Sequence, residues 1–327
     1  MKIKTLVATI TVALGLAFAT VINAKTSYTN SNNITLDYLT VNEGVYLSIE
    51  DSLFVSLEGS VNNAGGFYVT SSSATSVLLT GKHFENSGTV AFKSLSANAL
   101  SSFKVAASGS FLNTGNMYFL ISSANLVETP FNVSSMTSWT NSGMMFFQTD
   151  FKISPTLYLG KIQSGVSSIT NSRVICLSNI DWLTTTSIYG SGCISVGVTS
   201  KLEFQMFLQA LHHSISKTQT IYLASSSSSL TILGLAFDSD SFVIIKVAGF
   251  GGGNIIEVDY AFTKHTYDDI TGILRLLLSP LSEVGFKIGQ GYDYSLLKVS
   301  KDGQGIFYDG PAPKSRPDEC SCISLFF

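Results

Sequence analysis

The sequence predicts an all-β fold, a parallel β-solenoid followed by a smaller β unit, and three observations support this prediction. A corner motif recurs along the chain, short strand-like segments separate its copies, and no capped helical stripe occurs between them. The 327 residues are 45% hydrophobic and only 13% charged, whereas about 25% charged residues is usual in soluble globular proteins. The chain can therefore bury a substantial core beneath a neutral surface rich in Ser, Thr, Asn and Gly.

The first 24 residues are typical of a secretory signal peptide, with two early lysines, a long uncharged stretch and small residues before Lys25. The alternative is a membrane anchor, because the apolar run approaches the length that spans a bilayer. The threonines in the run and its Ile22-Asn23-Ala24 end favour cleavage there, although the cleaved bond could instead follow Ala19. We therefore exclude residues 1–24 from the predicted fold.

The charge of the mature chain limits the partners that it can bind. Removing Lys2 and Lys4 with the signal peptide changes the formal charge from −3 to −5 and leaves no basic cluster. Nucleic acid and anionic membranes are therefore poor partners. No second apolar segment is long enough to span a bilayer, so we expect an extracellular product without a membrane span, either soluble or attached to a matrix.

One sequence frame recurs within residues 25–200, the range of the predicted solenoid. It consists of an apolar residue, any residue, Asn, a small polar residue, Gly and then alternating apolar positions, as in "WTNSGMMFFQT". Such a period is the signature of a solenoid, in which each turn buries its apolar face against its neighbours. The asparagines of the five clear copies, spaced by 23, 27, 28 and 30 residues, are Asn63, Asn86, Asn113, Asn141 and Asn171.

The frame also predicts what the corners do. Glycine accepts the positive φ of a tight bend, and an inward asparagine can bond its own backbone or the asparagine of the next turn. We therefore expect the five asparagines to form a ladder along one edge of a coil of about six or seven turns, with strands about 4.8 Å apart. The alternative is a β-sandwich with unrelated Asn-Gly hairpin turns, which the recurrence of both the spacing and the apolar flanks disfavours.

Residues 201–312 lose this frame and predict a second β unit. Segments such as "FVIIKVAGFGGGNIIEVDYAF" and "FKIGQGYDYSLLKV" have the composition of strands separated by Gly-rich turns. The open end of a solenoid exposes strand edges and apolar side chains, so a cap is required there. We assign the capping role to this unit, and we expect a Pro-rich, polar tail over residues 313–327.

The four cysteines predict disulfides, because their number is even and the chain is exported. Cys176 and Cys193 lie 17 residues apart in similar β-rich settings, so we expect them to pair with each other rather than with Cys320 or Cys322. Zinc binding is the competing interpretation, but these spacings match no common zinc finger. The sequence therefore predicts no metal site and no cofactor.

No arrangement of residues predicts catalysis. Glycoside hydrolysis needs two facing carboxylates, whereas the acidic residues of the repeat region are scattered along the sequence. Asn33 in "NIT" and Asn132 in "NVS" match the N-glycosylation pattern. Exposed aromatic side chains on a solenoid face could stack on sugars or pack on proteins, but the sequence identifies no such patch.

The chain resembles the N-terminal domain of the fungal hyphally regulated cell wall protein family from about Asn33 to Pro313. The likeness rests on the Asn-x-Gly corners, on "RVICLSNIDWLTTTSIYGSGCISVG" and on the ordered series "VAGFGGGNIIEVDYAF", "TYDDITGILRLLL", "FKIGQGYDYSLL" and "YDGPAP". The resemblance implies a right-handed β-helix followed by a β-sandwich-like unit, displayed on the cell wall. Family members usually continue into a Ser/Thr-rich stalk and a lipid-anchor signal, neither of which occurs before Phe327, so the sequence predicts export without fixing how the product attaches to the wall.

Together with the resemblance, the sequence predicts an exported, non-enzymatic, adhesin-like wall glycoprotein whose solenoid is a rigid display surface. The expected partners are host cells, other yeasts, abiotic surfaces and wall glycans. Two other functions are compatible with the residues. One is a structural wall component without an external ligand, and the other is a secreted carbohydrate-active β-helix enzyme.

Overall fold

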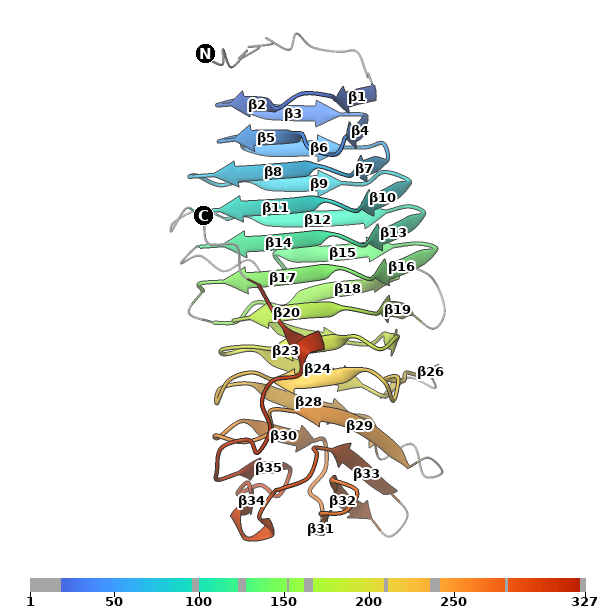
Figure 1. Ribbon diagram of the computed structural model, residues 1–327, viewed down its shortest axis with the longest axis vertical. Helices are drawn as coiled ribbons and strands as arrows, with labels where there is room; N and C mark the ends of the chain where they lie inside the picture. Colours follow the sequence, from blue (N-terminus) through green and yellow to red (C-terminus); the bar gives the residue numbers. More distant parts are fainter. Residues whose placement is uncertain are drawn as a thin grey trace.

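The structure is a computed structural model, and it describes residues 19–95, 100–122, 128–151, 153–161, 167–208, 211–235, 242–279 and 282–323. Within these ranges the fold is all-β, and most strands stack in parallel along one long axis (Figure 1). This arrangement confirms the predicted fold class. The described helices are short 3-10 turns, and none of them has the length or the hydropathy needed to cross a membrane. They are η2 (Tyr294–Leu296) and η3 (Asp318–Cys320).

Each turn of the repeat region places one strand in each of three sheets, which we call sheets A, B and C. Sheet A consists of short strands that precede the corners, and its eight strands exceed the six or seven turns expected. In spatial order they are β1 (Ala19–Ile22), β4 (Tyr38–Val41), β7 (Val61–Asn63), β10 (His83–Asn86), β13 (Ser110–Asn113), β16 (Ser138–Asn141), β19 (Ser168–Asn171) and β22 (Ser187–Tyr189).

Sheet B follows the corners and runs the whole length of the stack. Its strands are β2 (Thr26–Thr29), β5 (Tyr46–Glu50), β8 (Gly66–Ser71), β11 (Thr89–Ser94), β14 (Asn116–Ile121), β17 (Met144–Thr149), β20 (Val174–Ser178), β23 (Cys193–Val196), β27 (Thr220–Leu223), β29 (Val243–Ala248), β33 (Ser282–Lys287), β32 (Ile273–Ser279) and β31 (Lys264–Asp268).

The third side of the stack consists of sheet C and then sheet D, which meet at a bridge between Thr156 and Asp181. Sheet C contains β3 (Asn33–Leu36), β6 (Phe54–Leu57), β9 (Ser76–Leu79), β12 (Ser102–Ala107), β15 (Phe131–Ser135) and β18 (Leu157–Lys161). Sheet D contains β21 (Asp181–Thr184), β24 (Lys201–Gln205), β28 (Ser229–Leu233), β30 (Ile255–Val258), β35 (Gly305–Tyr308) and β34 (Leu297–Val299). A small hairpin joins β25 (Phe207–Leu208) to β26 (Leu211–His212).

Inward side chains form columns because residues in the same register point the same way in every turn. In sheet B, Phe119 lies between Phe92 and Phe147, with ring centroids 5.6 Å and 4.9 Å apart. In sheet A, Phe111 stacks on Trp139 at 5.0 Å. These rings are buried, and burying such aromatic surface supplies most of the stabilisation of a core. In the copy "WTNSGMMFFQT", Met145 and Phe147 therefore face the core, and Met144 and Phe146 face outward.

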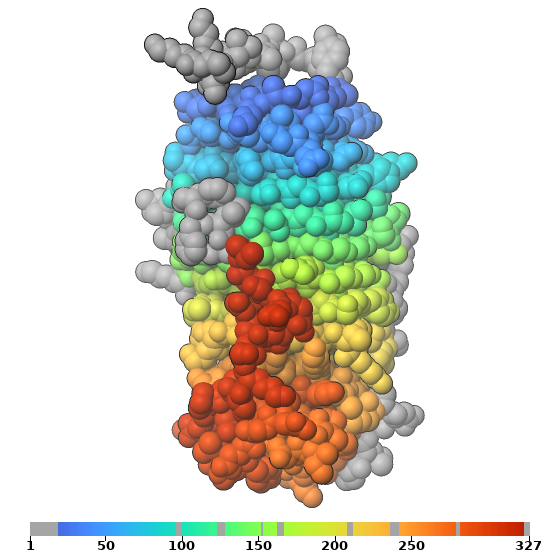
Figure 2. All heavy atoms as spheres, viewed as in Figure 1, coloured from blue at the N-terminus to red at the C-terminus, as the bar shows by residue number. Residues whose placement is uncertain are grey.

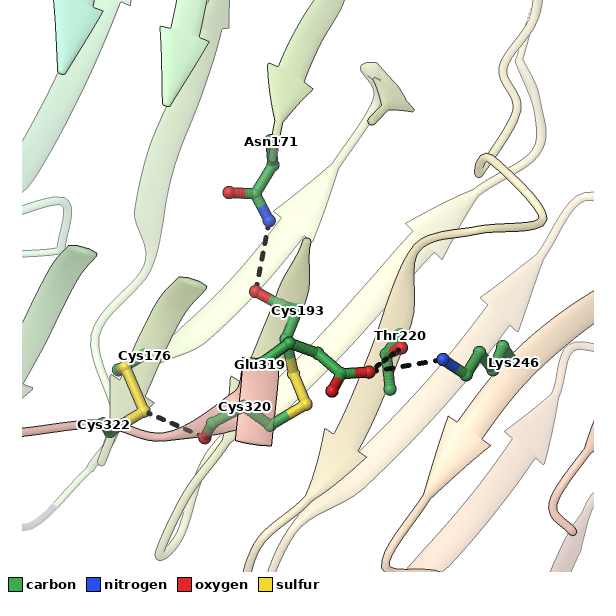
Figure 3. Close-up of a disulfide and its surroundings, with 8 residues drawn as sticks. All are labelled: Asn171, Cys176, Cys193, Thr220, Lys246, Glu319, Cys320 and Cys322. Atoms are coloured by element: carbon green, nitrogen blue, oxygen red, sulfur yellow. Dashed lines mark hydrogen bonds and ion pairs between the residues drawn. A yellow bond between two sulfur atoms is a disulfide. The ribbon is translucent and has the colours of Figure 1, made fainter. Parts of the chain in front are cut away.

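The five asparagines of the frame lie in one buried column at the ends of the sheet A strands. Each has 0% of its surface exposed. The Nδ2 atom of each asparagine donates to the Oδ1 atom of the next, at 2.7 Å from Asn63 to Asn86 and at 2.8 Å in the three later steps. At the last turn, Asn171 Nδ2 donates to the carbonyl oxygen of Cys193 at 3.1 Å (Figure 3). The amides therefore satisfy one another where water has no access, except at the first turn, where Asn63 Oδ1 has no hydrogen-bond partner among the described residues.

The corner glycines allow close approach of the turns, and the positive φ expected for them is wrong. None of Gly65, Gly88, Gly115 and Gly143 has a positive φ. A Cβ atom on any of the last three would overlap the carbonyl oxygen of the equivalent glycine one turn earlier. The carbonyl groups that a Cβ atom would meet belong to the backbone, and hydrogen bonds such as the one from Gly115 N to the Asn86 carbonyl at 3.1 Å hold that backbone in place. A side chain at the corner would therefore disrupt the stacking.

The parallel stack continues beyond residue 200, the predicted end of the solenoid. β23 pairs in parallel with β27, β24 with β28, and β28 with β30 as far as Val258. Sheet A ends at β22, and the later described strands belong to sheets B and D, apart from the β25–β26 hairpin. These later turns have no corner of the Asn-Gly type. The loss of the frame near residue 200 therefore marks the end of sheet A, and not the end of the stack.

Antiparallel strands close the C-terminal end of the stack. β31, β32 and β33 extend sheet B, while β34 and β35 extend sheet D. Their inward side chains, including Leu274, Phe286 and Ile306, belong to the same buried core as the parallel turns. These strands cover the last apolar turn by continuing the existing sheets.

The first described strand falls within the segment assigned to the signal peptide, of which residues 1–18 lie outside the described residues. β1 pairs in parallel with β4, and its Ile22 side chain is buried in the core. Cleavage after Ala24 would remove this strand and leave β4 at the edge of sheet A. Cleavage after Ala19, the alternative bond, would keep most of it.

Replacing Asn113 with alanine tests the asparagine column. The change removes the acceptor of Asn86 Nδ2 and the donor to both Asn141 Oδ1 and the Met144 carbonyl. Because buried polar groups then lose their partners, we expect the free energy of unfolding to fall by about 2–3 kcal/mol, as measured by chemical denaturation. The matched control is Asn116→Ala, because the Asn116 side chain is exposed. Equal losses in the two variants would contradict the proposed contribution of the column.

Candidate functional site

The C-terminal segment crosses the outer face of sheet B as a strap, which we define as residues 311–323. Figure 2 shows it as the red segment that runs up the visible face of the stack toward the N-terminal turns. Glu319 contacts β27 and β29, Cys320 is bonded to β23, and Cys322 is bonded to β20. The last described residue contacts β17. The strap therefore ties together five consecutive strands of sheet B.

The strap is attached by two disulfides, Cys176–Cys322 and Cys193–Cys320 (Figure 3). The expected pairing of Cys176 with Cys193 is therefore wrong. The Cα atoms of the two observed pairs are 6.0 Å and 5.2 Å apart, which is an ordinary separation for a disulfide.

The register of sheet B explains this pairing. Cys176 and Cys193 lie on adjacent strands but not opposite each other, because Cys193 faces Val174 and Cys176 faces Ser195. Cys176 and Cys193 therefore both point outward, but they are offset by two residues along the strand direction. The two tail cysteines are separated by a single residue, so each of them reaches one sheet cysteine as the strap crosses the strands. Spacing along the sequence could not reveal this match, because the tail approaches from the far end of the chain.

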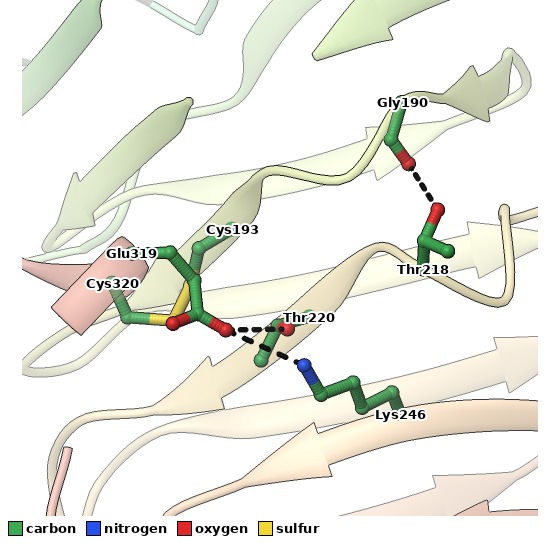
Figure 4. Close-up of polar contacts among 7 residues, drawn as sticks. All are labelled: Gly190, Cys193, Thr218, Thr220, Lys246, Glu319 and Cys320. Atoms are coloured by element: carbon green, nitrogen blue, oxygen red, sulfur yellow. Dashed lines mark hydrogen bonds and ion pairs between the residues drawn. A yellow bond between two sulfur atoms is a disulfide. The ribbon is translucent and has the colours of Figure 1, made fainter. Parts of the chain in front are cut away.

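Next to the disulfides, Glu319 binds two further strands of sheet B. Its Oε1 atom accepts hydrogen bonds from Thr220 Oγ1 and Lys246 Nζ, both at 3.3 Å (Figure 4). A hydrogen bond from its own backbone, together with the bond and the charge of Lys246, holds the pKa of Glu319 below its usual range. The ion pair is partly exposed, so it contributes at most about 1 kcal/mol, and the disulfides dominate the attachment.

The outer face of sheet B carries an apolar cluster that is separate from the main core. An outward face of a sheet is normally polar when it meets water, so this cluster is a departure from the pattern. The strap lies over its part on β17, β20 and β23. Its buried members are Ala91, Tyr118, Met144, Phe146, Val174, Cys176, Cys193 and Cys320, and Tyr68, Leu120, Tyr222 and Cys322 pack against them.

A groove continues this face beyond the strap, over β5, β8, β11 and β14, and we call it the tyrosine groove. It encloses about 480 Å³ and extends across four strands, roughly 14 Å along the stack. Its lining combines aromatic rings, hydroxyl groups and one cation. The lining residues are Tyr46, Ser48, Tyr68, Thr70, Ala91, Lys93, Tyr118 and Leu120.

Ala91 lies between two tyrosines of this groove. Tyr68, Ala91 and Tyr118 share one register on β8, β11 and β14, so the tyrosines are two strand spacings apart, about 9.6 Å. On one side Tyr46 packs against Tyr68 with centroids 6.1 Å apart, and on the other side Tyr118 packs against Phe146 at 6.5 Å. The small side chain of Ala91 thus interrupts a row of three aromatic rings, Tyr68, Tyr118 and Phe146. Ala91 and Tyr118 lie deep in the groove, with 8% and 3% of their surface exposed.

Among the described residues that line the groove there is a lysine and no carboxylate. Burial, with a smaller effect of Tyr46, raises the pKa of Tyr68, and burial also raises the pKa of Tyr118. Both phenols therefore stay protonated at neutral pH and can donate hydrogen bonds. Lys25 Nζ lies 5.9 Å from the centroid of Tyr46, within the range of a cation–π contact.

Acidic side chains gather at one place on sheet D. Lys201 Nζ lies 2.7 Å from Glu203 Oε1 and 4.0 Å from Glu257 Oε2, and Thr231 Oγ1 also donates to Glu257. Burial, together with the charge of Glu203, raises the pKa of Asp181 on the adjacent strand. None of these side chains lines the tyrosine groove. In the part of the chain that the structure describes, no three or more His, Cys, Asp or Glu side chains are placed to hold a metal ion.

The two candidate glycosylation sites lie on strands of sheet C. Asn33 is exposed on β3, the first strand of that sheet. Asn132 is half-buried on β15 between Lys104 and Tyr158 of the adjacent strands, and Ser134 of its pattern is fully buried. Asn33 is therefore the more accessible acceptor.

The tyrosine groove cannot be recognised from any single strand, because strands such as "NMYFLI" are apolar on both faces and show no alternation. The signal was nevertheless present in the frame. The position three residues after the corner glycine is outward, and it is occupied in successive copies by Tyr68, Ala91, Tyr118, Phe146 and, in the copy with Arg173 at the corner, Cys176. Comparing this position across the copies would have identified both the aromatic row and the cysteine that holds the strap.

Comparison with known proteins gives a consistent family match. A family model described as "Hyphally regulated cell wall protein N-terminal" matches residues 10–326. Among proteins of Candida albicans, cell wall protein RBR3 is 32% identical over 308 residues, which cover 86% of this chain and 18% of that protein. Hyphally regulated cell wall protein 4 is 32% identical over 314 residues, which cover 88% of this chain and 24% of that protein. The chain therefore spans about a quarter or less of the length of these relatives.

Replacing Cys322 with serine tests the disulfide pairing. We expect one free thiol, on Cys176, because the Cys193–Cys320 bond does not involve the changed residue. Alkylation of the unreduced, denatured protein followed by peptide mass spectrometry locates that thiol. The matched variant Cys320→Ser should instead leave Cys193 free. Alkylation of Cys320 in the first variant would contradict the pairing.

Proposed function

Because the chain belongs to the family of hyphally regulated cell wall protein N-terminal domains, we propose that it is an exported, non-enzymatic module of the fungal cell surface that mediates adhesion. The stacked strands provide a rigid body, and the tyrosine groove on their outer face provides the contact site. The observation that carries the proposal is this groove, which presents aromatic rings and hydroxyl groups on the outside of a sheet.

The groove is rigid before any partner arrives, which supports a role in binding. Its residues lie on four strands that pair continuously in one register. The strap adds two disulfides on the same sheet. A binding surface that is ordered in advance loses little conformational entropy on binding, so more of the contact energy appears as affinity.

Export and display at the cell wall are part of the same proposal. The relatives are named as cell wall proteins, and residues 1–24 have the pattern of a signal peptide. The neutral, hydroxyl-rich composition suits a surface that meets wall polymers and other cells without strong long-range charge.

Polysaccharide hydrolysis is a second candidate, because one observation favours it. A hydrolase needs an acid of raised pKa opposite a second carboxylate, and Asp181 with its raised pKa lies near Glu203. Glu203 is paired with Lys201 at 2.7 Å, however, and the cluster lies on sheet D, away from the tyrosine groove. These features favour a structural network over a catalytic pair, and therefore adhesion over hydrolysis.

Display of the full chain on a non-adherent yeast tests the proposal. We expect the displaying cells to adhere to epithelial cells, plastic or other yeasts above cells that carry the display scaffold alone. The double variant Tyr46→Ala with Tyr68→Ala should reduce adhesion severalfold, because it removes two partly exposed aromatic rings of the groove. Adhesion is counted after washing, at equal surface levels of an epitope tag.

The matched control for this assay is Tyr38→Ala, which removes a tyrosine that is 55% exposed on sheet A and outside the groove. Its adhesion should equal that of the unchanged chain. Adhesion of the unchanged chain no higher than the scaffold would refute the adhesive function. Undiminished adhesion of the double variant would show that the contact site lies elsewhere.

A further inference from the structure

We propose that the strap transmits tension on the chain beyond Ile323 directly to the middle of sheet B, so that the C-terminal turns of the stack are not pulled. This inference concerns the strap, and it depends on neither the tyrosine groove nor the adhesive function. It follows from three features, which are the loops that the disulfides close, the place where the strap joins the sheet, and the burial of the sulfur atoms.

The two disulfides close one loop inside another. Cys176–Cys322 joins residues that are 146 positions apart, and Cys193–Cys320 joins residues that are 127 positions apart within that loop. A pull that arrives at Cys322 passes through the sulfur atoms to Cys176 on β20. The covalent bond holds at forces that open the hydrogen bonds of a sheet, so the chain between the two cysteines cannot extend. Residues 177–321, which include the antiparallel strands, are therefore outside the path of the tension.

Without the disulfides, the tension would enter at the C-terminal end of the stack. The strap follows β35, where Asp309 N donates to the Leu296 carbonyl oxygen at 2.9 Å and Gly252 N donates to the Gly310 carbonyl oxygen at 2.6 Å. A pull at this point opens the bonds of one short strand in sequence from its end. Terminal elements of a fold open at lower free energy than its interior, so the C-terminal strands would be the first to separate.

The disulfide to β20 moves the entry of the tension to a strand that is held on both sides. β20 pairs with residues 144–148 of β17 and with residues 193–196 of β23. Cys176 lies at its centre, between Ile175 and Leu177, which are buried in the main core. Figure 1 shows β20 in the middle of the stack. Bonds on both flanks and the packed side chains must therefore give way together, which raises the barrier that governs forced unfolding.

The burial of the sulfur atoms keeps this path covalent. Reduction by a thiol requires a thiolate to reach one sulfur atom of the disulfide. Cys193 and Cys320 are both 0% exposed, whereas Cys322 is only partly buried. A reductant therefore reaches the bond of Cys322 first. When that bond is lost, the remaining one still joins the strap to β23, which is again an interior strand of sheet B.

Pulling on single molecules of the purified full chain with optical tweezers tests the inference. One handle is attached to an azide-bearing residue in place of Ser108, which is exposed between β12 and β13, and the other to the C-terminal end. The comparison variant combines Cys176→Ser, Cys193→Ser, Cys320→Ser and Cys322→Ser. We expect the unchanged chain to extend about 500 Å less than this variant when fully unfolded. The variant should also begin to unfold at a lower force, because its C-terminal strands open in sequence.

The matched control combines Cys176→Ser with Cys322→Ser and keeps the inner disulfide. It should extend only about 65 Å more than the unchanged chain, and its first unfolding force should stay close to that of the unchanged chain. Reduction of the unchanged chain gives a fully open path without any substitution, so the test does not depend on the folding of the fourfold variant. Circular dichroism confirms that each oxidised chain is folded.

Two results would overturn the inference. One is an unchanged, oxidised chain that extends as far as the reduced chain, because the tension would then pass through the C-terminal turns. The other is a first unfolding force that is the same in the oxidised chain, the reduced chain and the fourfold variant, because the strap would then give these turns no protection.

Discussion

The buried column from Asn63 to Asn171 is the interaction on which the rest of the structure depends. Each amide bonds the amide of the next turn, so a turn that slipped by one residue would lose both its donor and its acceptor. In a strand, a slip of one residue also exchanges the inward and outward faces. The column therefore fixes which side chains of sheet B reach the outside. The corner glycines contribute by allowing the turns to stack closely enough for these bonds to form.

That register divides the outer face of sheet B into two parts with different roles. Toward the C-terminal end, the outward row meets the strap, which is held by disulfides at Cys176 and Cys193. Toward the N-terminal end, the same row is left open as the tyrosine groove. Ala91 is the small residue between Tyr68 and Tyr118 in this row. It interrupts the aromatic side chains of the outer face.

Much of the fold was predictable from the sequence, because the repeats encode it directly. The frame around Asn113 and Asn141 predicted stacked parallel turns and an edge of asparagines, and the structure places all five asparagines on one edge. The frame is a property of the corners between sheets A and B. It could not indicate that sheets B and D continue after sheet A ends at β22.

The contacts of the tail and the groove were beyond what single-copy patterns can show. The pairing of Cys320 and Cys322 depends on where the strap crosses β23 and β20, which is a contact over 127 and 146 residues of sequence. The groove depends on outward positions in strands that are apolar on both faces. Comparison of the copies of the frame, and not any single strand, indicates that Tyr68, Ala91 and Tyr118 share one row, as the structure shows.

A crystal structure of the full chain would test most directly whether the asparagine column fixes the register of the stack. We predict side-chain hydrogen bonds that run from Asn63 to Asn171 without a break, with Tyr68, Ala91 and Tyr118 in one row on the outer face of sheet B. Asparagine side chains that lie on different edges, or strands of sheet B paired in another register, would contradict the account.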